Sequence, residues 1–287
     1  MLSHRIYLNL EKTIEMRTIL IPTDFSKCAL NAANYAIELA KITNSKLVLY
    51  HSYFYSSPLG RPEAFFDANQ LEDVKINAFK MLEELANDQL KLPTMDIEYV
   101  LDHSMSIGNL ASEVNEMCSK HQVDLIVMGT HGATGMIQKV LIGSNAASMI
   151  ASAHHPVMII PEKWKFSKLY KIVFATSLDE IKDEKLLEPL TELSWLIAPE
   201  IKFLVVVKSD DDLPSDEQME QYLKLHAYFN HATHRLHTIV DHDTLRGINN
   251  YILEDKPDLV VTIPRKQSFF QQLFGESISK ELAYESL

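Results

Sequence analysis

The sequence predicts an α/β fold made of two tandem, doubly wound open parallel sheets, with five strands in the first. Short apolar runs alternate with helical stretches through the first half, the same order begins again at Lys171, and a cluster of glycines follows one apolar run. Alternating strands and helices form parallel sheets, because right-handed crossovers carry each helix over a face of the sheet.

Five buried strands are expected in the first half, at the runs TILIPT, KLVLYHS, IEYVLD, DLIVMG and PVMII. Each run is apolar at nearly every position, which is typical of parallel strands covered on both faces. Helical periodicity marks Ala29–Lys41, Phe65–Leu90 and Leu110–Lys120, and a further helix is expected to begin at Ser144.

The second half repeats the first. KIVFATSLD, IKFLVVVKSD, LHTIVDHD and PDLVVTIPRK correspond in position and character to TILIPTDFS, SKLVLYHSYF, IEYVLDHS and VDLIVMGTHG. A repeat of this length indicates two related domains. We expect an N-terminal extension at 1–15, a first domain at 16–162, a linker at 163–170, and a second domain at 171–287 without the last strand.

Composition narrows the classes of partner and compartment. The 287 residues carry a formal net charge of −12, whereas nucleic-acid binding needs a cationic surface. No apolar run is long enough to span a bilayer, and the two cysteines suit a reducing compartment. The sequence therefore predicts a cytoplasmic protein with neither nucleic-acid nor membrane partners.

Four of the chain's 8 glycines, Gly129, Gly132, Gly135 and Gly143, lie close together after the fourth expected strand. In open parallel sheets, ligands bind beyond the carboxyl ends of the strands. Glycine lets backbone N–H groups approach a phosphate, and a helix N-terminus favours an anion. Asp24, at the end of the first strand, suits a ribose or base. The alternative is that these glycines only form turns and start a helix.

The segments ILIPTDFSKCALNAANYAIELAK, VDLIVMGTHGATG and IGSNAA together resemble the universal stress protein family. The resemblance covers Arg17 to Pro161 and, more weakly, the second half, as in tandem bacterial members. It implies the adenine-nucleotide-hydrolase-like fold and binding of ATP, or of AMP or ADP, with Mg²⁺ as an accompanying ion. In the family, the pattern G-x2-G-x9-G-[S/T] and an aspartate after the first strand bind the nucleotide.

The resemblance implies a nucleotide site with two ends. The residues expected toward the nucleoside are Pro22, Thr23, Asp24, Ser52, Met128 and Gly129, and those expected toward the phosphates are His131, Gly132, Gly143, Ser144 and Asn145. Ten residues separate Gly132 from Gly143 where the family pattern has nine. No catalytic residue and no metal ligand is assigned.

The second domain departs from this pattern. Ser177 stands in the place of Asp24, Ile263 to Lys266 replace the first glycine turn, and Glu276 follows Gly275 where a hydroxyl is expected. Proline removes an N–H donor and a glutamate repels phosphate. We therefore expect one nucleotide per chain at most.

These features favour a nucleotide-binding stress-response protein that acts through conformation or partners. A nucleotide-free interaction module and a slow ATPase are the alternatives, although the chain has no Walker lysine or positioned base. The fifth strand, Val157–Ile160, lacks a counterpart in the second half and is expected to pair with a second copy in a homodimer. Alternatively, residues 1–15 cover this edge.

One further cluster, of histidines, is a candidate metal site. His231 and His234 are three residues apart and could share a helix face, with His226 nearby. A zinc site needs several ligands that converge tetrahedrally. His237 falls in an expected strand and points elsewhere, so no metal site is predicted.

Overall fold

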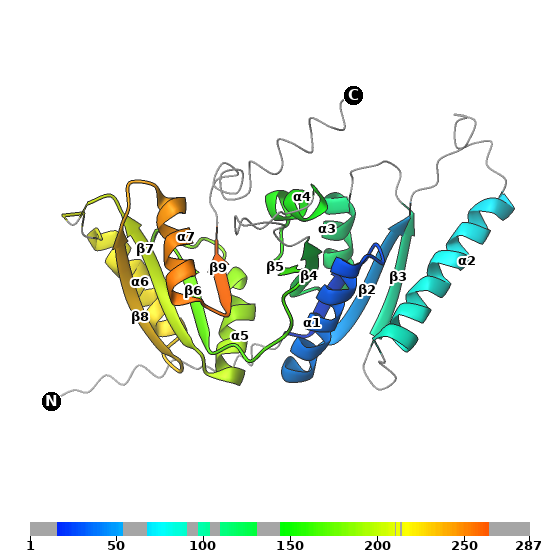
Figure 1. Ribbon diagram of the computed structural model, residues 1–287, viewed down its shortest axis with the longest axis horizontal. Coiled ribbons are helices and arrows are strands. Elements are labelled where there is room, and N and C mark those ends of the chain that lie inside the picture. Colours follow the sequence, from blue (N-terminus) through cyan, green and yellow to red (C-terminus); the bar gives the residue numbers. More distant parts are fainter. Residues whose placement is uncertain are drawn as a thin grey trace, which may run out of the picture.

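The computed structural model describes residues 16–53, 68–90, 97–103, 110–130, 144–209, 211–212 and 214–263. Within these ranges the chain forms a five-stranded and a four-stranded parallel sheet, which lie side by side in Figure 1. We call the five-stranded sheet with its helices the first unit, and the four-stranded sheet with its helices the second unit.

The first unit has the strand order β3-β2-β1-β4-β5. Its strands are β1 (Thr18–Pro22), β2 (Lys46–Tyr53), β3 (Ile97–His103), β4 (Leu125–Thr130) and β5 (Val157–Pro161). Its helices are α1 (Lys27–Thr43), α2 (Ala68–Glu84), α3 (Leu110–His121) and α4 (Ser144–Ser152). The five expected strands are therefore confirmed.

The second unit has the order β8-β7-β6-β9. Its strands are β6 (Lys171–Ala175), β7 (Glu200–Val207), β8 (Thr233–Val240) and β9 (Leu259–Thr262). Its helices are the 3₁₀ turn η3 (Glu184–Leu187), α5 (Glu188–Ile197), α6 (Asp216–Tyr228) and α7 (Thr244–Asp255). The order matches β3-β2-β1-β4 of the first unit, as a repeated fold requires.

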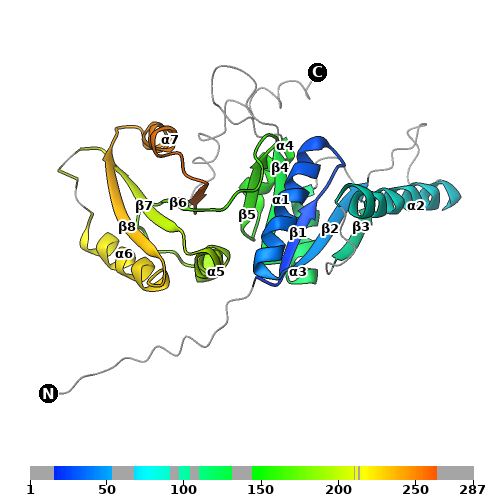
Figure 2. The same cartoon turned by 60° about the horizontal axis from the view of Figure 1, so that its bottom comes forward.

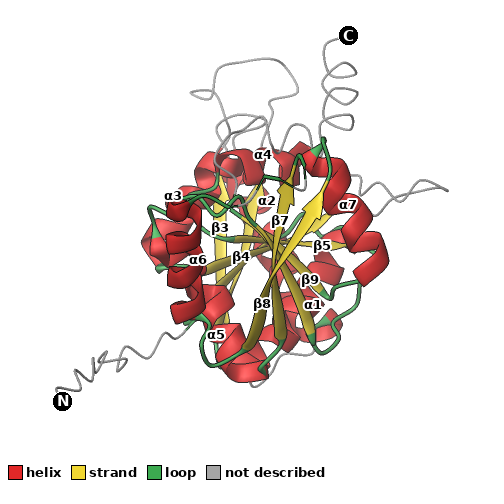
Figure 3. Ribbon diagram, turned by 90° about the vertical axis from the view of Figure 1, so that its left-hand side faces the viewer, coloured by secondary structure: helices red, strands yellow, loops and turns green. Residues whose placement is uncertain are grey.

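Each sheet carries helices on both faces, which Figure 3 shows in red around the yellow strands. In the first unit, Leu47 and Leu49 of β2 pack in one core with α1 and α2. The alternate residues Val48 and Tyr50 pack in a second core with α3 and α4. Both faces of β2 are thus buried, which explains why its sequence is apolar without alternation.

The expected helix at 65–90 differs from the one observed. The structure has α2 over Ala68–Glu84 and then a π-helical turn, η2, over Leu85–Gln89. The N–H of Leu90 donates to the carbonyl of Leu85 at 2.9 Å, five residues back. The wider turn keeps Leu85, Ala86 and Leu90 buried together in the core beneath α1 and α2. Hydrophobic periodicity cannot distinguish such a turn from regular helix.

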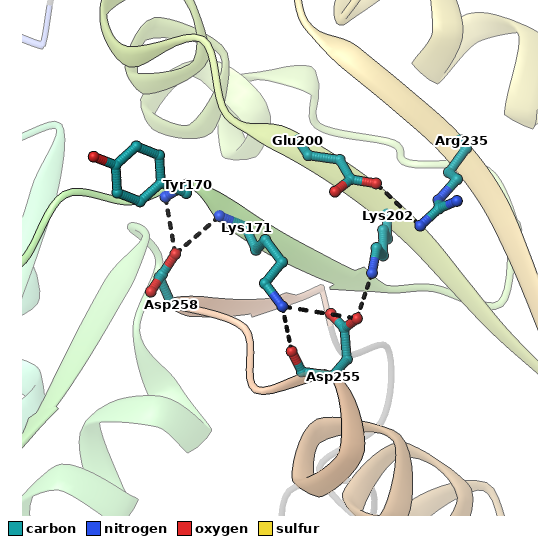
Figure 4. Close-up of polar contacts among 7 residues, drawn as sticks. All are labelled: Tyr170, Lys171, Glu200, Lys202, Arg235, Asp255 and Asp258. Carbon is teal, nitrogen blue, oxygen red and sulfur yellow. Dashed lines mark hydrogen bonds and ion pairs between the residues drawn. The ribbon is translucent and has the colours of Figure 1, made fainter.

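The repeat extends to single hydrogen bonds. Asp124 Oδ2 accepts the N–H groups of Arg17 and Thr18 at 2.8 and 3.0 Å. In the second unit Asp258 Oδ2 accepts those of Tyr170 and Lys171 at 2.8 and 2.9 Å (Figure 4). In each unit, one carboxylate just before the fourth strand therefore fixes the start of the unit's first strand.

One repeated contact has its charges reversed. Lys46 of β2 pairs with Glu98 of β3 at 2.6 Å, whereas Glu200 of β7 pairs with Arg235 of β8 at 3.1 Å. The positions correspond, because β2 and β3 pair in the same register as β7 and β8. The geometry of this pair is therefore kept while its polarity is inverted.

The second unit also buries an ammonium group. Lys202 stands where Val48 stands in the first unit, and its side chain is 7% exposed. Figure 4 shows Lys202 and Lys171 pointing toward Asp255, at the end of α7. Burial opposes the charged form, but hydrogen bonds to Asp255 and Tyr251 outweigh it and raise the pKa of Lys202. The network holds the end of α7 against the sheet.

The two units share apolar packing. Leu193 of α5 is buried in the core that α1 forms with the first sheet, and Figure 2 shows α5 on the side of the first unit that carries α1 and β5. The rings of Tyr35 and Phe166 meet edge to face at 4.9 Å. The buried carboxylate of Glu192 accepts the N–H of Met16. α1 is therefore the element of the first unit on which the second unit rests.

In the residues that the structure describes, no helix combines the length and the apolar character needed to cross a membrane.

Candidate functional site

The candidate site lies at the carboxyl ends of β1, β2 and β4. β1 runs between β2 and β4, so its end lies beside both of theirs. The N–H of Thr23 donates to the carbonyl of Tyr50 at 2.8 Å, which extends the pairing of β1 with β2 beyond Pro22. Pro22, Thr23 and Met128 are buried, and Ser52 is half-buried.

Asp24 occupies an exposed turn between β1 and α1. Its Oδ1 accepts the N–H of Ser26 at 3.0 Å, and Thr23 Oγ1 accepts the N–H of Phe25 at 3.0 Å. Phe25 has a φ of 63°, which is uncommon for a residue with a side chain. Ser26 then caps α1 by accepting the N–H of Ala29 at 3.2 Å. The turn therefore holds the exposed Asp24 carboxylate just beyond the carboxyl end of β1.

The turn after β6 repeats this geometry without the carboxylate. The N–H of Thr176 donates to the carbonyl of Leu204 at 2.9 Å, and that of Leu178 to Thr176 Oγ1 at 3.0 Å. Leu178 has a φ of 55°, matching Phe25. Ser177 occupies the position of Asp24, and its hydroxyl donates to Asp179 at 2.6 Å.

Gly129 has a packing role that the sequence analysis did not identify. A Cβ at this position would lie 2.3 Å from the carbonyl oxygen of Cys28 and 2.9 Å from the nitrogen of Ala29. Real Cβ atoms do not approach backbone so closely, so the first turn of α1 can rest on β4 only if this residue is glycine. The packing accounts for this glycine without a ligand.

Glu113 is a residue of the site region that the sequence analysis missed. It lies in the first turn of α3 and is buried, and its Oε2 accepts the hydroxyl of Ser52 at 2.6 Å. The Tyr50 hydroxyl lies 3.5 Å from the same oxygen. Because 61 positions separate Ser52 from Glu113, no local motif connects them. Only the fold brings this carboxylate to the end of β2.

Comparison with known proteins shows the family to which the first unit is similar. The universal stress protein family matches residues 15–161 of the 287 residues. The chain belongs to this family. Universal stress protein MJ0531 of Methanocaldococcus jannaschii is 32% identical over 153 residues, which are 52% of this chain and 84% of that protein. Universal stress protein Sll1654 of Synechocystis is 32% identical over 150 residues, 52% of this chain and 87% of that protein.

A solved structure extends the likeness to the second unit. The crystal structure of a universal stress protein from Archaeoglobus fulgidus superposes with a TM-score of 0.65 and covers 86% of each chain, at 15% sequence identity. At that identity the comparison shows the fold alone. The coverage exceeds the matched range 15–161, so part of the second unit has the same fold.

Most residues expected at the phosphate end of the candidate site of this universal stress protein lie outside the described residues. They are His131, Gly132 and Gly143, and the loop between the two glycines also lies outside. α4 begins at Ser144, as the sequence predicts, and Asn145 in its first turn is exposed. An N-terminal helix end is therefore present where the glycine segment ends.

The structure does not place His231 and His234 on one helix face. α6 ends at Tyr228, and His234 lies on β8, where its Nε2 is 2.7 Å from Nδ1 of His226. His231 instead bonds Ser194 Oγ at 2.6 Å and stacks on Trp195, and burial lowers its pKa. In the described ranges no group of three or more His, Cys, Asp or Glu side chains is arranged to hold a metal ion.

Proposed function

We propose that this universal stress protein binds ATP, or another adenine nucleotide such as AMP or ADP, in its first unit. It acts in the stress response of the cytoplasm through conformation or partners, without a dedicated reaction. The observation that carries the proposal is the exposed Asp24 carboxylate at the end of β1. The strand order reverses between the adjacent strands β1 and β4. Ligands of open parallel sheets usually bind at such a point of reversal.

The two ends of the site have different chemistry. Asp24 accepts hydrogen bonds, as a ribose or base requires, and it repels phosphate. The N-terminus of α4 supplies free N–H groups and a positive dipole end for the phosphates. Mg²⁺ enters with the nucleotide, because it binds chiefly through substrate phosphates and few protein carboxylates. Ser177 replaces the carboxylate in the second unit, which supports one nucleotide per chain.

Calorimetric titration with ATP tests the proposal. Asp24→Asn keeps an oxygen for the Ser26 N–H and removes the charge. We expect the loss of a charged hydrogen bond to weaken binding by about 1.5–3 kcal/mol, or roughly ten- to a hundredfold. Ser177→Ala, at the equivalent turn of the second unit, is the matched control and is expected to bind like the parent. If Asp24→Asn binds ATP as tightly as the parent does, the site is rejected. If the parent does not bind ATP, a nucleotide-free interaction module remains.

We also infer a symmetric homodimer through the edge strand β5. Among the described strands β5 pairs with β4 alone, and Val157 and Ile159 are half-buried. An apolar edge strand favours pairing with another chain. Sedimentation of the full chain as a monomer would contradict the dimer and favour cover by residues 1–15.

A further inference from the structure

We propose that the second unit carries a binding site for a linear organic polycation, an amine with two or more ammonium groups along an alkyl chain. The site is a cavity of about 510 Å³ between α6 and the turn that follows β6. In Figure 1 and Figure 2, α6 lies with β8 at the end of the molecule away from the first unit. The cavity is therefore separate from the nucleotide site proposed for the first unit.

The walls of the cavity are acidic. Four carboxylate side chains line it, two from the turn after β6 and two from the start of α6, namely Asp179, Glu180, Glu217 and Glu220. Of the described lining residues Lys224 alone is cationic, and its Nζ pairs with Oε1 of Glu220 at 3.3 Å. Four carboxylates against one ammonium group leave an excess of three negative charges. A concave surface lined by one sign of charge concentrates ions of the opposite sign.

The cavity also contains a buried polar group without a partner. Gln221 of α6 is 6% exposed, and among the described residues its side-chain amide forms no hydrogen bond. The amide is not sealed off from the surface, and Gln221 borders both this cavity and a smaller one that adjoins it. Leaving a buried amide unpaired costs free energy. A ligand that donates a hydrogen bond to the Gln221 carbonyl oxygen removes this cost.

Apolar side chains lie between the carboxylates. Leu178 borders the main cavity, and Ile181 and Leu187 border the smaller one. Ile181 packs against the core of the second unit but is only half-buried, so it offers a surface to an alkyl chain. An alkyl chain with charged groups can lie along apolar surface while those groups stay at the polar rim.

This lining favours an organic polycation over a metal ion. In the ranges that the structure describes, no three His, Cys, Asp or Glu side chains are arranged to hold a metal, so the carboxylates do not converge on one point. Cavities of about 300–1,000 Å³ are typical of small-molecule sites. Separate ammonium groups on one alkyl chain can each meet a different carboxylate, and one of them can donate to Gln221 as well.

Calorimetric titration of the full chain with spermidine, in the absence of nucleotide, tests the proposal. Gln221→Leu removes the amide and keeps the net charge, and we expect it to weaken spermidine binding about fivefold or more. Because a chain with a net charge of −12 attracts any polyamine, this charge-neutral variant separates a defined site from diffuse attraction. n-Butylamine, which has one ammonium group, is expected to bind the parent about tenfold more weakly than spermidine.

A second variant is expected to act in the opposite direction. Lys224→Gln removes the cation from the cavity and should tighten spermidine binding about twofold or more. Lys120→Gln is its matched control, because Lys120 pairs with Glu116 four residues before it on α3, as Lys224 does with Glu220 on α6. The control should change binding less than Lys224→Gln does.

Three results would overturn the proposal. The parent would not bind spermidine, or Gln221→Leu would bind it as tightly as the parent, or Lys224→Gln and Lys120→Gln would tighten binding equally. The last result would assign the binding to net charge. Circular dichroism establishes whether Gln221→Leu is folded. If it is not, the comparison of the two lysine variants decides, because a folding defect does not tighten binding.

Discussion

Gly129 shows how closely α1 packs against β4. Its missing Cβ leaves room for the carbonyl of Cys28, which lies in backbone and cannot rotate away. We expect Gly129→Ala to lower the free energy of unfolding by about 1–3 kcal/mol, the usual range for overpacking. Denaturant melts followed by circular dichroism measure this loss.

Gly247 provides the control for that substitution. A Cβ there would lie 3.0 Å from side-chain atoms of Asp241 and Val206, a contact that needs far less adjustment than the 2.3 Å approach at Gly129, and the position is within α7, where alanine favours helix. Gly247→Ala should therefore change stability less than Gly129→Ala. Equal losses would show that the backbone contact at Gly129 is not decisive.

Single residues of the site differ in how far sequence predicts them. Asp24 could be predicted as a site residue because it directly follows an apolar strand, and ligands bind at the strand ends in this fold. Gly129 was identified as a site residue, but its contact with Cys28 depends on how α1 is seated. Glu113 was missed because its partner Ser52 is distant in sequence and nothing local marks a buried carboxylate.

At the scale of elements, the ion pair between β2 and β3 makes the stability of the fold depend on pH. The hydrogen bond from Lys46 lowers the pKa of Glu98 against the opposing effect of burial, and His121 lowers it further. A depressed carboxyl pKa stabilises the fold at pH values above the ordinary range, and that stability is lost as the pH falls through the folded value. The effect is small because both side chains are about one-third exposed.

Thermal melts of the parent and Glu98→Gln test this sign. We expect the parent to have the higher Tm near neutral pH and the two curves to converge in acid, as Glu98 becomes protonated in the parent. Glu116→Gln, which removes a carboxylate from an exposed pair on α3, serves as the control. A constant difference at every pH would mean that the charge of Glu98 is irrelevant.

The elements themselves were largely predictable, because both faces of the sheets are buried and strand runs are apolar throughout. The failures have local causes. The π-helical turn after α2 buries the same positions as a regular helix would, so hydrophobic periodicity cannot detect it. The sequence allowed one helix face for His231 and His234 because the end of α6 at Tyr228 and the start of β8 at Thr233 are only a short turn apart.

At the scale of the molecule, Leu193 joins the two units. It belongs to α5 but is buried in the core of the first unit. Leu-to-Ala substitutions in cores cost about 2–5 kcal/mol. We expect Leu193→Ala to destabilise the contact between the units and to split one cooperative unfolding transition into two.

Trp195, on α5, makes this measurable once Trp164 is replaced by Phe throughout, because the Trp164 carbonyl accepts a hydrogen bond from Asn31 of α1 and Trp164 therefore also reports on the first unit. In the parent, fluorescence and circular dichroism should report the same midpoint. In Leu193→Ala, fluorescence should change at lower denaturant than circular dichroism. Leu196→Ala, on the exposed side of α5, should leave the transitions coincident. Coincident transitions in Leu193→Ala would show that the units are not coupled through this residue.

The reversed polarity of one repeated ion pair bears on how such a chain reaches its folded state. Two copies of a fold in one polypeptide can exchange strands and misassemble. A sheet that joined β2 to β8 would bring Lys46 against Arg235, and one that joined β7 to β3 would bring Glu200 against Glu98. Each mismatch sets like charges together, whereas each correct pairing attracts. The inversion thus favours pairing of β2 with β3 and of β7 with β8 over the two exchanged pairings.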